Sequence, residues 1–243
     1  MKKEKEEGNH MNIQGFQKTT LLDFPEHLAA TIFLGGCNFR CPFCHNGELV
    51  LTPNATPPLS LSLSDILAYL EKRKGILEGV CITGGEPTLE KELPFLLKEI
   101  KALDYEIKLD TNGYCPDLLK QLVEEKLIDY VAMDIKNCPQ KYPETTGLST
   151  INVDNIEKSV DYLLKGTLPY EFRTTIVKEL HVEKDIHIIG EWLKGAQKYF
   201  LQSYEESEFV IQKGFHSPDK ETLLHFQELL LPNIPNTKIR GID

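Results

Sequence analysis

Short apolar segments alternate with amphipathic helical patterns along most of this chain, and that alternation is the feature that most constrains its fold. Segments rich in apolar and β-branched residues are predicted to be strands, and they lie at 29–34, 79–83, 106–110, 130–136, 171–177 and 198–202. Leucine and isoleucine recur at helical spacing near 63–70, 90–102, 116–122, 153–165, 183–194 and 219–231. Strands that alternate with helices pair in parallel through right-handed crossovers, so the chain is predicted to form an α/β fold.

The number of strands selects among the parallel α/β folds. Six strand–helix units are too few for a closed eight-stranded barrel, so we predict an open partial (β/α)6 barrel, with a flat doubly wound sheet as the alternative. A short edge strand is also expected at 237–239. The sequence shows no internal repeat and no interdomain linker, so residues 11–243 are expected to form one domain after a charged, disordered tail at 1–10.

Composition narrows the class of protein. The 37 acidic and 27 basic side chains give a formal charge of -10, which argues against a nucleic-acid surface because phosphates need clustered Lys and Arg. The N-terminus has no apolar signal segment and no apolar run approaches ~20 residues, so neither export nor a membrane span is expected. We therefore predict a cytoplasmic protein, in which clustered cysteines bind metals more often than they form disulfides.

Three of the six cysteines lie together in the Gly- and Pro-containing loop that follows the first predicted strand. Cys37, Cys41 and Cys44 form a CxxxCxxC pattern. Three thiolates can ligate three irons of a 4Fe–4S cluster and leave the fourth iron open, as a catalytic metal site requires.

Three other chemistries fit parts of the same loop. Cys41 and Cys44 could form a redox pair, but this leaves Cys37 unexplained. Cys41 to His45 matches a C-x-x-C-H haem-attachment pattern, which requires export. The three cysteines and His45 supply four zinc ligands, although adjacent ligands at 44 and 45 would strain a tetrahedral site.

Unusual polar residues also follow the other predicted strands. They are Gly84-Gly85-Glu86-Pro87, Asp110-Thr111-Asn112, Asp134 with Lys136, Arg173, and Gln202. Taken singly, these are typical of an ordinary turn, a capped turn or a structural ion pair. Parallel strands would bring all of them to one rim of the sheet, so together they predict a site around the cysteine loop.

The combined motifs resemble a known enzyme superfamily. CxxxCxxC with Phe43 before its last cysteine, together with Gly-Gly-Glu-Pro at 84–87, is similar to the radical S-adenosylmethionine (SAM) superfamily. The runs LLDFP at 21–25 and FLGGCNFRCPFCHN at 33–46 most resemble the anaerobic ribonucleoside-triphosphate reductase activating proteins, which are glycyl-radical enzyme activases. The resemblance extends over residues 11–202.

The resemblance implies a role for each site residue. Cys37, Cys41 and Cys44 would ligate the 4Fe–4S cluster, while Gly84, Gly85 and Glu86 would receive the SAM ammonium group. Phe43 would lie near the adenine, and Lys136 and Arg173 would hold the SAM carboxylate or ribose, with Asp134 beside them. Asp110, Thr111 and Asp134 resemble the monovalent-cation site of activating enzymes. No role is implied for Gln202, whereas Cys81 is expected in the core and Cys115 and Cys138 are expected to be free thiols.

The resemblance also implies a reaction and two protein partners. SAM would be cleaved reductively to a 5′-deoxyadenosyl radical, which would take a hydrogen from a glycine of anaerobic ribonucleotide reductase. A flavodoxin- or ferredoxin-type protein would donate the electron. The alternatives are radical modification of a small molecule or peptide, and a non-catalytic iron–sulfur or zinc protein that uses the same loop to bind a partner.

Overall fold

The computed structural model describes residues 11–51 and 62–242. The predicted tail at 1–10 lies outside the described residues, as does almost all of the proline-rich connection at 51–61. Within the described residues, the chain alternates strands and helices in the predicted order.

All strands belong to one sheet, whose spatial order follows the chain from β1 to β8. The strands are β1 (Ile13–Thr20), β2 (Ala29–Leu34), β3 (Gly79–Gly84), β4 (Glu106–Thr111), β5 (Tyr130–Asp134), β6 (Tyr170–Ile176), β7 (Tyr199–Ser203) and β8 (Thr237–Arg240). β1 is antiparallel to β2, and every later neighbour is parallel. The six predicted strands are β2 to β7, and the expected edge strand is β8, so the prediction of an open parallel α/β barrel is confirmed.

The strand β1 was not predicted. Its sequence, IQGFQKTT, has no regular alternation of apolar and polar residues, and its pairing with β2 contains register shifts at both ends. Pairing with β2, rather than its own pattern, therefore makes this segment a strand.

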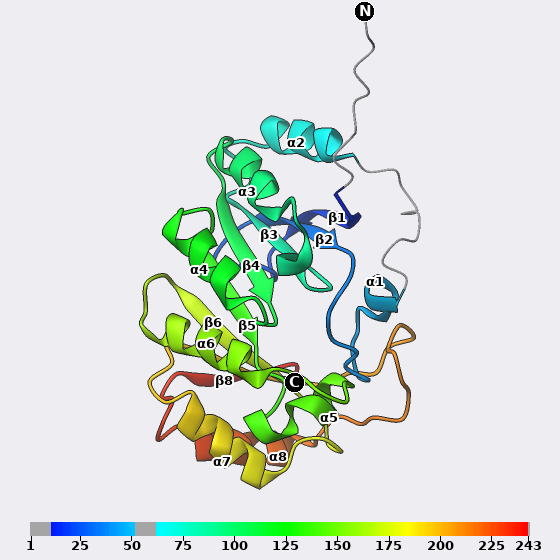
Figure 1. The fold of residues 1–243 in the computed structure, drawn as a ribbon, viewed down its shortest axis with the longest axis vertical. Helices are drawn as coiled ribbons and strands as arrows, with labels where there is room; N and C mark the ends of the chain where they lie inside the picture. The colour runs from blue at the N-terminus through cyan, green and yellow to red at the C-terminus, as the bar shows by residue number, and fades with distance from the viewer. Residues whose placement is uncertain (1–10, 52–61, 243) are drawn as a thin grey trace, which may run out of the picture.

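Apart from α1, which lies beside the segment after β7, the helices follow the strands around the outer face of the sheet, from α2 at the top of Figure 1 to α8 at the bottom. They are α1 (Gly47–Leu51), α2 (Leu63–Lys72), α3 (Leu93–Lys101), α4 (Pro116–Glu124), α5 (Tyr142–Thr146), α6 (Val153–Leu164), α7 (Glu183–Trp192) and α8 (Lys220–Leu230). Ser62 caps α2 through a capping box with Asp65. α1 and α5 were not predicted, because a helix of five residues is too short to show a helical period.

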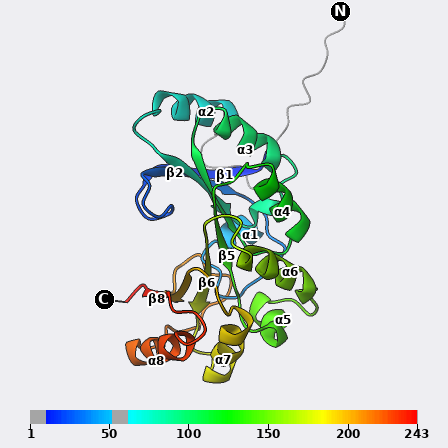
Figure 2. The same ribbon diagram turned by 90° about the vertical axis from the view of Figure 1, so that its left-hand side faces the viewer.

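The two faces of the sheet have different chemistry. On β4, Ile107 and Leu109 are fully buried in the main hydrophobic core, while Lys108 and Asp110 alternate with them and lie on the opposite face. In Figure 2, which turns the molecule by 90° about the vertical axis, helices such as α3, α4 and α6 lie along one side of the sheet. The helix-covered face is thus apolar, and the concave interior carries charged groups.

No helix in the described ranges is long and apolar enough to span a bilayer.

Candidate active site

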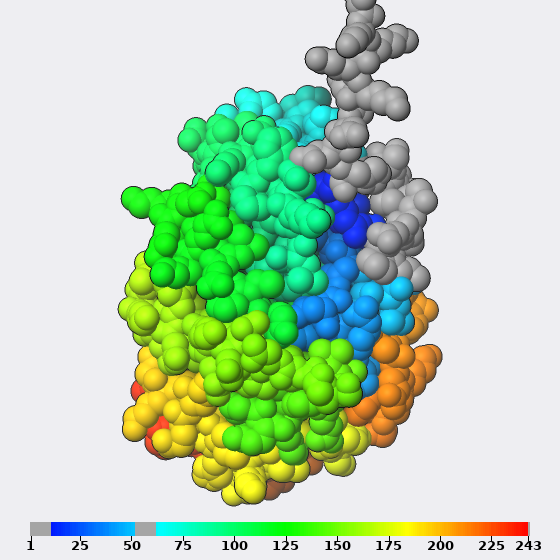
Figure 3. Space-filling view, viewed as in Figure 1, coloured from blue at the N-terminus to red at the C-terminus, as the bar shows by residue number. Residues whose placement is uncertain are grey.

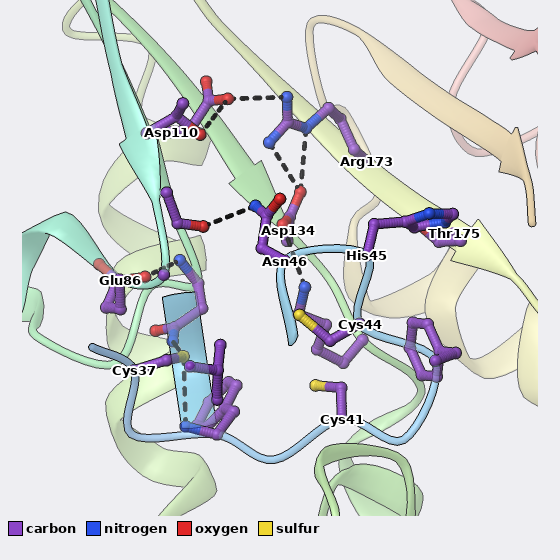
Figure 4. Close-up of a pocket in the computed structure, with 18 of the residues that line it drawn as sticks. Cys37, Cys41, Cys44, His45, Asn46, Glu86, Asp110, Asp134, Arg173 and Thr175 are labelled. Atoms are coloured by element: carbon purple, nitrogen blue, oxygen red, sulfur yellow. Dashed lines mark hydrogen bonds and ion pairs between the residues drawn. The ribbon is translucent and has the colours of Figure 1, made fainter. Parts of the chain in front are cut away.

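A cavity of about 340 Å³ lies at the C-terminal ends of the parallel strands (Figure 4). Its volume is within the range of small-molecule sites. Every predicted site residue lines it: Cys37, Cys41, Phe43, Cys44, Gly84, Gly85, Glu86, Asp110, Asp134, Lys136 and Arg173. The structure therefore brings together residues that the sequence spreads over more than half the chain.

The three loop cysteines line one wall of this cavity as free thiols. Burial raises the pKa of Cys37 to about 11 and that of Cys41 to about 12, and it also raises the pKa of Cys44. Metal ligation would therefore displace protons from neutral thiols. The described residues contain no group of three His, Cys, Asp or Glu side chains arranged around a single ion, and the His45 ring packs against Tyr204 instead. Three cysteine thiols on one cavity wall are soft sulfur donors, the type of ligand that an iron–sulfur cluster takes.

Backbone contacts hold the start of the cysteine loop against the turn that follows β3. The N–H of Glu86 donates to the Gly36 carbonyl at 2.8 Å, and the N–H of Gly85 donates to the Leu34 carbonyl at 2.9 Å. A Cβ added at Gly85 would lie 2.0 Å from the Gly36 oxygen, and one at Gly84, where φ is +124°, would lie 2.2 Å from the Leu34 oxygen. These glycines are therefore needed for close contact between two segments of the chain itself.

Two distant segments hold the middle of the loop. The Arg40 N–H donates to the Thr146 carbonyl at the end of α5, and the Gln212 N–H donates to the Pro42 carbonyl, both at 2.8 Å. In Figure 3 the blue atoms of the cysteine-loop region lie beside the orange atoms of the segment after β7. No motif described in the sequence analysis indicates this contact.

Glu86 is buried and its carboxylate is already hydrogen-bonded within the protein. Oε1 accepts hydrogen bonds from the N–H and hydroxyl of Thr88 and from the Thr111 hydroxyl, and Oε2 accepts one from the Asn112 N–H at 2.6 Å. Burial raises the pKa of Glu86, and these hydrogen bonds oppose the rise. Glu86 therefore joins the ends of β3 and β4, a structural task beyond the ligand contact predicted for it.

A chain of ion pairs forms the opposite wall of the cavity. Arg173 contacts Asp134 at 2.9 Å and Asp110 at 3.3 Å, and Lys136 contacts Asp134 at 3.0 Å. Lys108, which is 2% exposed and was not predicted as a site residue, pairs with Asp110 from deeper in the barrel. The carboxylates and cations alternate along this chain, so each buried charge has a partner.

The pairing determines the protonation states of the two carboxylates. Burial alone would raise the pKa of Asp134, but the Arg173 guanidinium and the Lys136 ammonium lower it to about 2. Burial likewise opposes ionisation of Asp110, whose pKa Arg173 and Lys108 nevertheless lower. Both carboxylates are thus ionised at neutral pH.

The residues predicted for a monovalent-cation site are paired within the protein in this structure. The Arg173 guanidinium bridges Asp110 and Asp134, and the Thr111 hydroxyl donates to Glu86.

The backbone of Lys136 is fixed on both sides by buried rings. Its N–H donates to the Tyr142 hydroxyl at 3.2 Å, and its carbonyl lies 2.9 Å from Nε2 of His181. The Val177 N–H donates to Nδ1 of His181, which assigns the proton to Nε2. Burial lowers the pKa of His181, in keeping with a neutral ring.

The remaining predicted residues occupy simple environments. Phe43 is 3% exposed and lies edge-on to Tyr204, and Gln202 lines the cavity. Cys81 is fully buried, as predicted, although it faces Lys108 in the barrel interior. Cys115 and Cys138 are free thiols, as predicted, and neither lines the cavity.

Comparison with known proteins identifies the family to which this chain belongs. The model of the radical SAM superfamily matches residues 31–187. A protein of Methanocaldococcus jannaschii named as a glycyl-radical enzyme activating enzyme is 30% identical over 237 residues, which cover 95% of this chain and 96% of the relative.

Solved structures share the fold at low sequence identity. Streptococcus suis SuiB bound to S-adenosylmethionine has a TM-score of 0.65 at 17% identity, over 87% of this chain and 52% of SuiB. A domain of pyruvate-formate lyase-activating enzyme from Bacteroides vulgatus has a TM-score of 0.56 at 18% identity, over 68% of this chain and 99% of that domain. The chain belongs to the radical SAM superfamily, whose members use a 4Fe–4S cluster and SAM.

Proposed function

We propose that this radical SAM enzyme installs a glycyl radical on a partner enzyme, anaerobic ribonucleotide reductase. The observation that carries the proposal is the near full-length match, at 30% identity, to a protein named as a glycyl-radical enzyme activating enzyme. The choice of the reductase as partner rests on the resemblance of the runs at 21–25 and 33–46. The protein is proposed to act in the cytoplasm, as a single domain formed by residues 11–243.

Cys37, Cys41 and Cys44 are proposed to ligate the cluster. Three thiol donors lie along one wall of a cavity, and soft sulfur ligands are the set that iron–sulfur clusters require. When bound, the cluster and SAM supply a one-electron cleavage that yields methionine and a 5′-deoxyadenosyl radical. The protein contributes binding, orientation and exclusion of water.

The opposite wall supplies groups of the right charge for SAM. Lys136 and Arg173 are proposed to hold its carboxylate or ribose, because both are cationic and both line the cavity. The turn at Gly84 and Gly85 is proposed to receive the ammonium group. In this scheme Glu86 fixes the turn, since four hydrogen bonds from the protein already occupy its carboxylate.

Phe43 is proposed to pack near the adenine, because it lines the cavity within the cysteine loop. Asp134 is proposed to orient Lys136 and Arg173 through its ion pairs with both. The reducing electron is proposed to come from a flavodoxin- or ferredoxin-type protein, and the partner's glycine loop to enter at the cavity mouth.

The direct test uses the full chain reconstituted anaerobically with iron and sulfide. With a one-electron reductant and SAM, it should release 5′-deoxyadenosine and generate a glycyl radical on the reductase, seen by electron paramagnetic resonance. A reductase whose radical-bearing glycine is replaced by alanine is the control for the site of the radical. Cys41→Ala should abolish SAM cleavage, whereas Cys115→Ala, which alters a thiol away from the cavity, should retain it.

Two outcomes separate the parts of the proposal. SAM cleavage without a radical on the reductase would remove the reductase as partner and leave the radical chemistry standing. Full SAM cleavage by Cys41→Ala would overturn the assignment of the cluster ligands.

A further inference from the structure

The sulfur of Cys37 lies among nitrogen donors for which the sequence analysis predicted no role. The Phe39 N–H donates to Cys37 Sγ at 3.3 Å, and the side-chain amide of Asn112 donates to the same sulfur at 3.9 Å. Asn112 also donates to Oδ1 of Asn38 at 2.8 Å. Two asparagines from different strand ends therefore meet at one cysteine.

The orientation of the Asn112 amide follows from its backbone neighbours. The Tyr114 N–H can only donate, and it contacts Asn112 Oδ1 at 3.0 Å. Nδ2 of Asn112 must then be the atom that faces Cys37 and Asn38. The Asn112 N–H in turn donates to Glu86, so the residue is anchored by its backbone as well as its side chain.

The orientation of Asn38 follows from that of Asn112. Its Oδ1 accepts the Asn112 amide, and its Nδ2 is consequently buried without a hydrogen-bond partner in the described part of the chain. An unpaired buried amide is costly, and it is tolerated where it serves a site. In this protein, the orientation that leaves Asn38 Nδ2 unpaired is also the one in which Asn38 Oδ1 holds the Asn112 amide beside the Cys37 sulfur.

The other two cysteines have different surroundings. Burial raises the pKa of Cys44, and the nearby Lys136 ammonium opposes the rise. The same two influences act most strongly on the Cys41 thiol. Of the three loop cysteines, Cys37 is the one whose sulfur receives a side-chain N–H within the described residues.

We propose that Asn112, oriented by the Tyr114 N–H and held by its hydrogen bond to Asn38, is a positioning residue that raises the reduction potential of the bound cluster through Cys37. A hydrogen bond to a ligating sulfur withdraws electron density and favours the more negative, reduced cluster. The inference rests on the cluster that family membership implies and on the assignment of Cys37 as a ligand. It does not depend on which protein receives the radical.

The test is an anaerobic redox titration of the reconstituted full chain, monitored by electron paramagnetic resonance of the reduced cluster. It uses neither SAM nor a partner enzyme. In Asn112→Ser, the hydroxyl can still accept the Tyr114 N–H but is too short to reach Cys37. The ratio of reduced to oxidised cluster at a fixed potential should fall about tenfold, which for a one-electron couple is about 59 mV.

The matched control is Asn46→Ser. Asn46 is an asparagine on the same cavity, but its side chain donates to the Gly84 carbonyl at 2.7 Å and to no sulfur. The substitution removes no side-chain donor to a ligating sulfur, so the ratio of reduced to oxidised cluster in this variant should stay within about twofold of the wild-type ratio.

The iron and sulfide content per chain distinguishes a change in the reduction potential of the cluster from a failure to assemble it. A fully loaded Asn112→Ser protein with an unchanged potential would overturn the proposal, as would a shift no larger than that of Asn46→Ser. If Asn112→Ser does not load, Asn38→Ser decides, because it releases the Asn112 amide and should lower the potential in the same direction by a smaller amount. An unchanged potential in Asn38→Ser would then reject the inference.

Discussion

The two walls of the cavity achieve rigidity by different means. The cysteine loop is held by backbone hydrogen bonds and by glycines in close contact with it, and its thiols are uncharged when no metal is bound. The strand-end wall is held by ion pairs among side chains that are charged at neutral pH. A change on the first wall should therefore act through shape, and a change on the second through charge.

The largest expected effect comes from a substitution that disrupts the close contact between the turn after β3 and the cysteine loop. In Gly85→Ala the new methyl group would lie 2.0 Å from the Gly36 carbonyl oxygen, so the turn and the cysteine loop must separate. We expect a loss of about 3 kcal/mol or more in the free energy of unfolding, together with loss of iron loading. Urea unfolding and iron analysis measure the two effects.

Gly195→Ala is the control for adding a methyl group at a glycine where no neighbouring atom has to move. Gly195 has a φ of +85° and open space around its Cα, so alanine there incurs only left-handed strain of about 1–2 kcal/mol. Equal effects of the two substitutions would show that the contact with Gly36 has no special importance.

The next largest effect is expected from removing a positive charge from the strand-end wall. Arg173→Met keeps much of the side-chain volume and leaves Asp110 and Asp134 without their shared cation. We expect a destabilisation of about 3 kcal/mol, because two buried carboxylates then share only the Lys108 and Lys136 ammonium groups, and a rise in the pKa of Asp134. Iron loading should survive, in contrast to Gly85→Ala.

Arg173→Lys sharpens this prediction. It restores the charge but not the planar group that reaches both carboxylates, so it should recover only part of the lost stability. Full recovery would mean that charge alone matters on this wall.

A smaller effect should appear in the pH dependence of stability. The pKa of Asp134 is about 2 in the folded protein, against an ordinary value of 3.8, so its ionised form favours folding. That contribution is complete above about pH 4 and is lost as the pH falls through about 2.

Asp134→Asn should flatten the curve of unfolding free energy against pH in this acid window and leave its slope near neutrality unchanged. Urea titrations at a series of pH values measure the curve. A variant curve parallel to that of wild type between pH 4 and 2 would contradict the assigned ion pairs.

The smallest expected effect acts on Lys136 through its backbone. His181→Phe fills the buried site but cannot donate to the Lys136 carbonyl. One hydrogen bond contributes about 1 kcal/mol, so the KM for SAM should rise about fivefold with little change in kcat. A fall in kcat with an unchanged KM would indicate that His181 acts elsewhere.

Much of the fold could be predicted from sequence because its signals are local. The strands β2 to β7 are short, apolar and bounded by turns, and the period of the helices between them is clear. The candidate site was predictable for a related reason. Parallel strands carry whatever follows them to one rim, so the position of Asp110 or Lys136 along its strand was enough to place it.

The missed features depend on contacts between distant residues. No local pattern in Gln212 indicates that its N–H reaches Pro42, and nothing near Lys108 shows that it lies inside the barrel beside Asp110. The glycines at 84 and 85 were predicted to allow approach of a ligand. The structure shows that they also allow close approach of the cysteine loop. A sequence motif cannot distinguish between these two roles.

The distant contacts of the cysteine loop have a consequence for how the protein matures in the cell. The loop leaves the ribosome early, but its supports at Thr146 and Gln212 are made much later. At ordinary rates of synthesis, the interval between Cys44 and Gln212 is roughly 10–30 s. Through that time the three thiols belong to an incomplete domain, exposed to oxidation and to other metals. Iron delivery should therefore be most productive after the segment beyond β7 has docked, and cells would need to keep the nascent cysteines reduced until then.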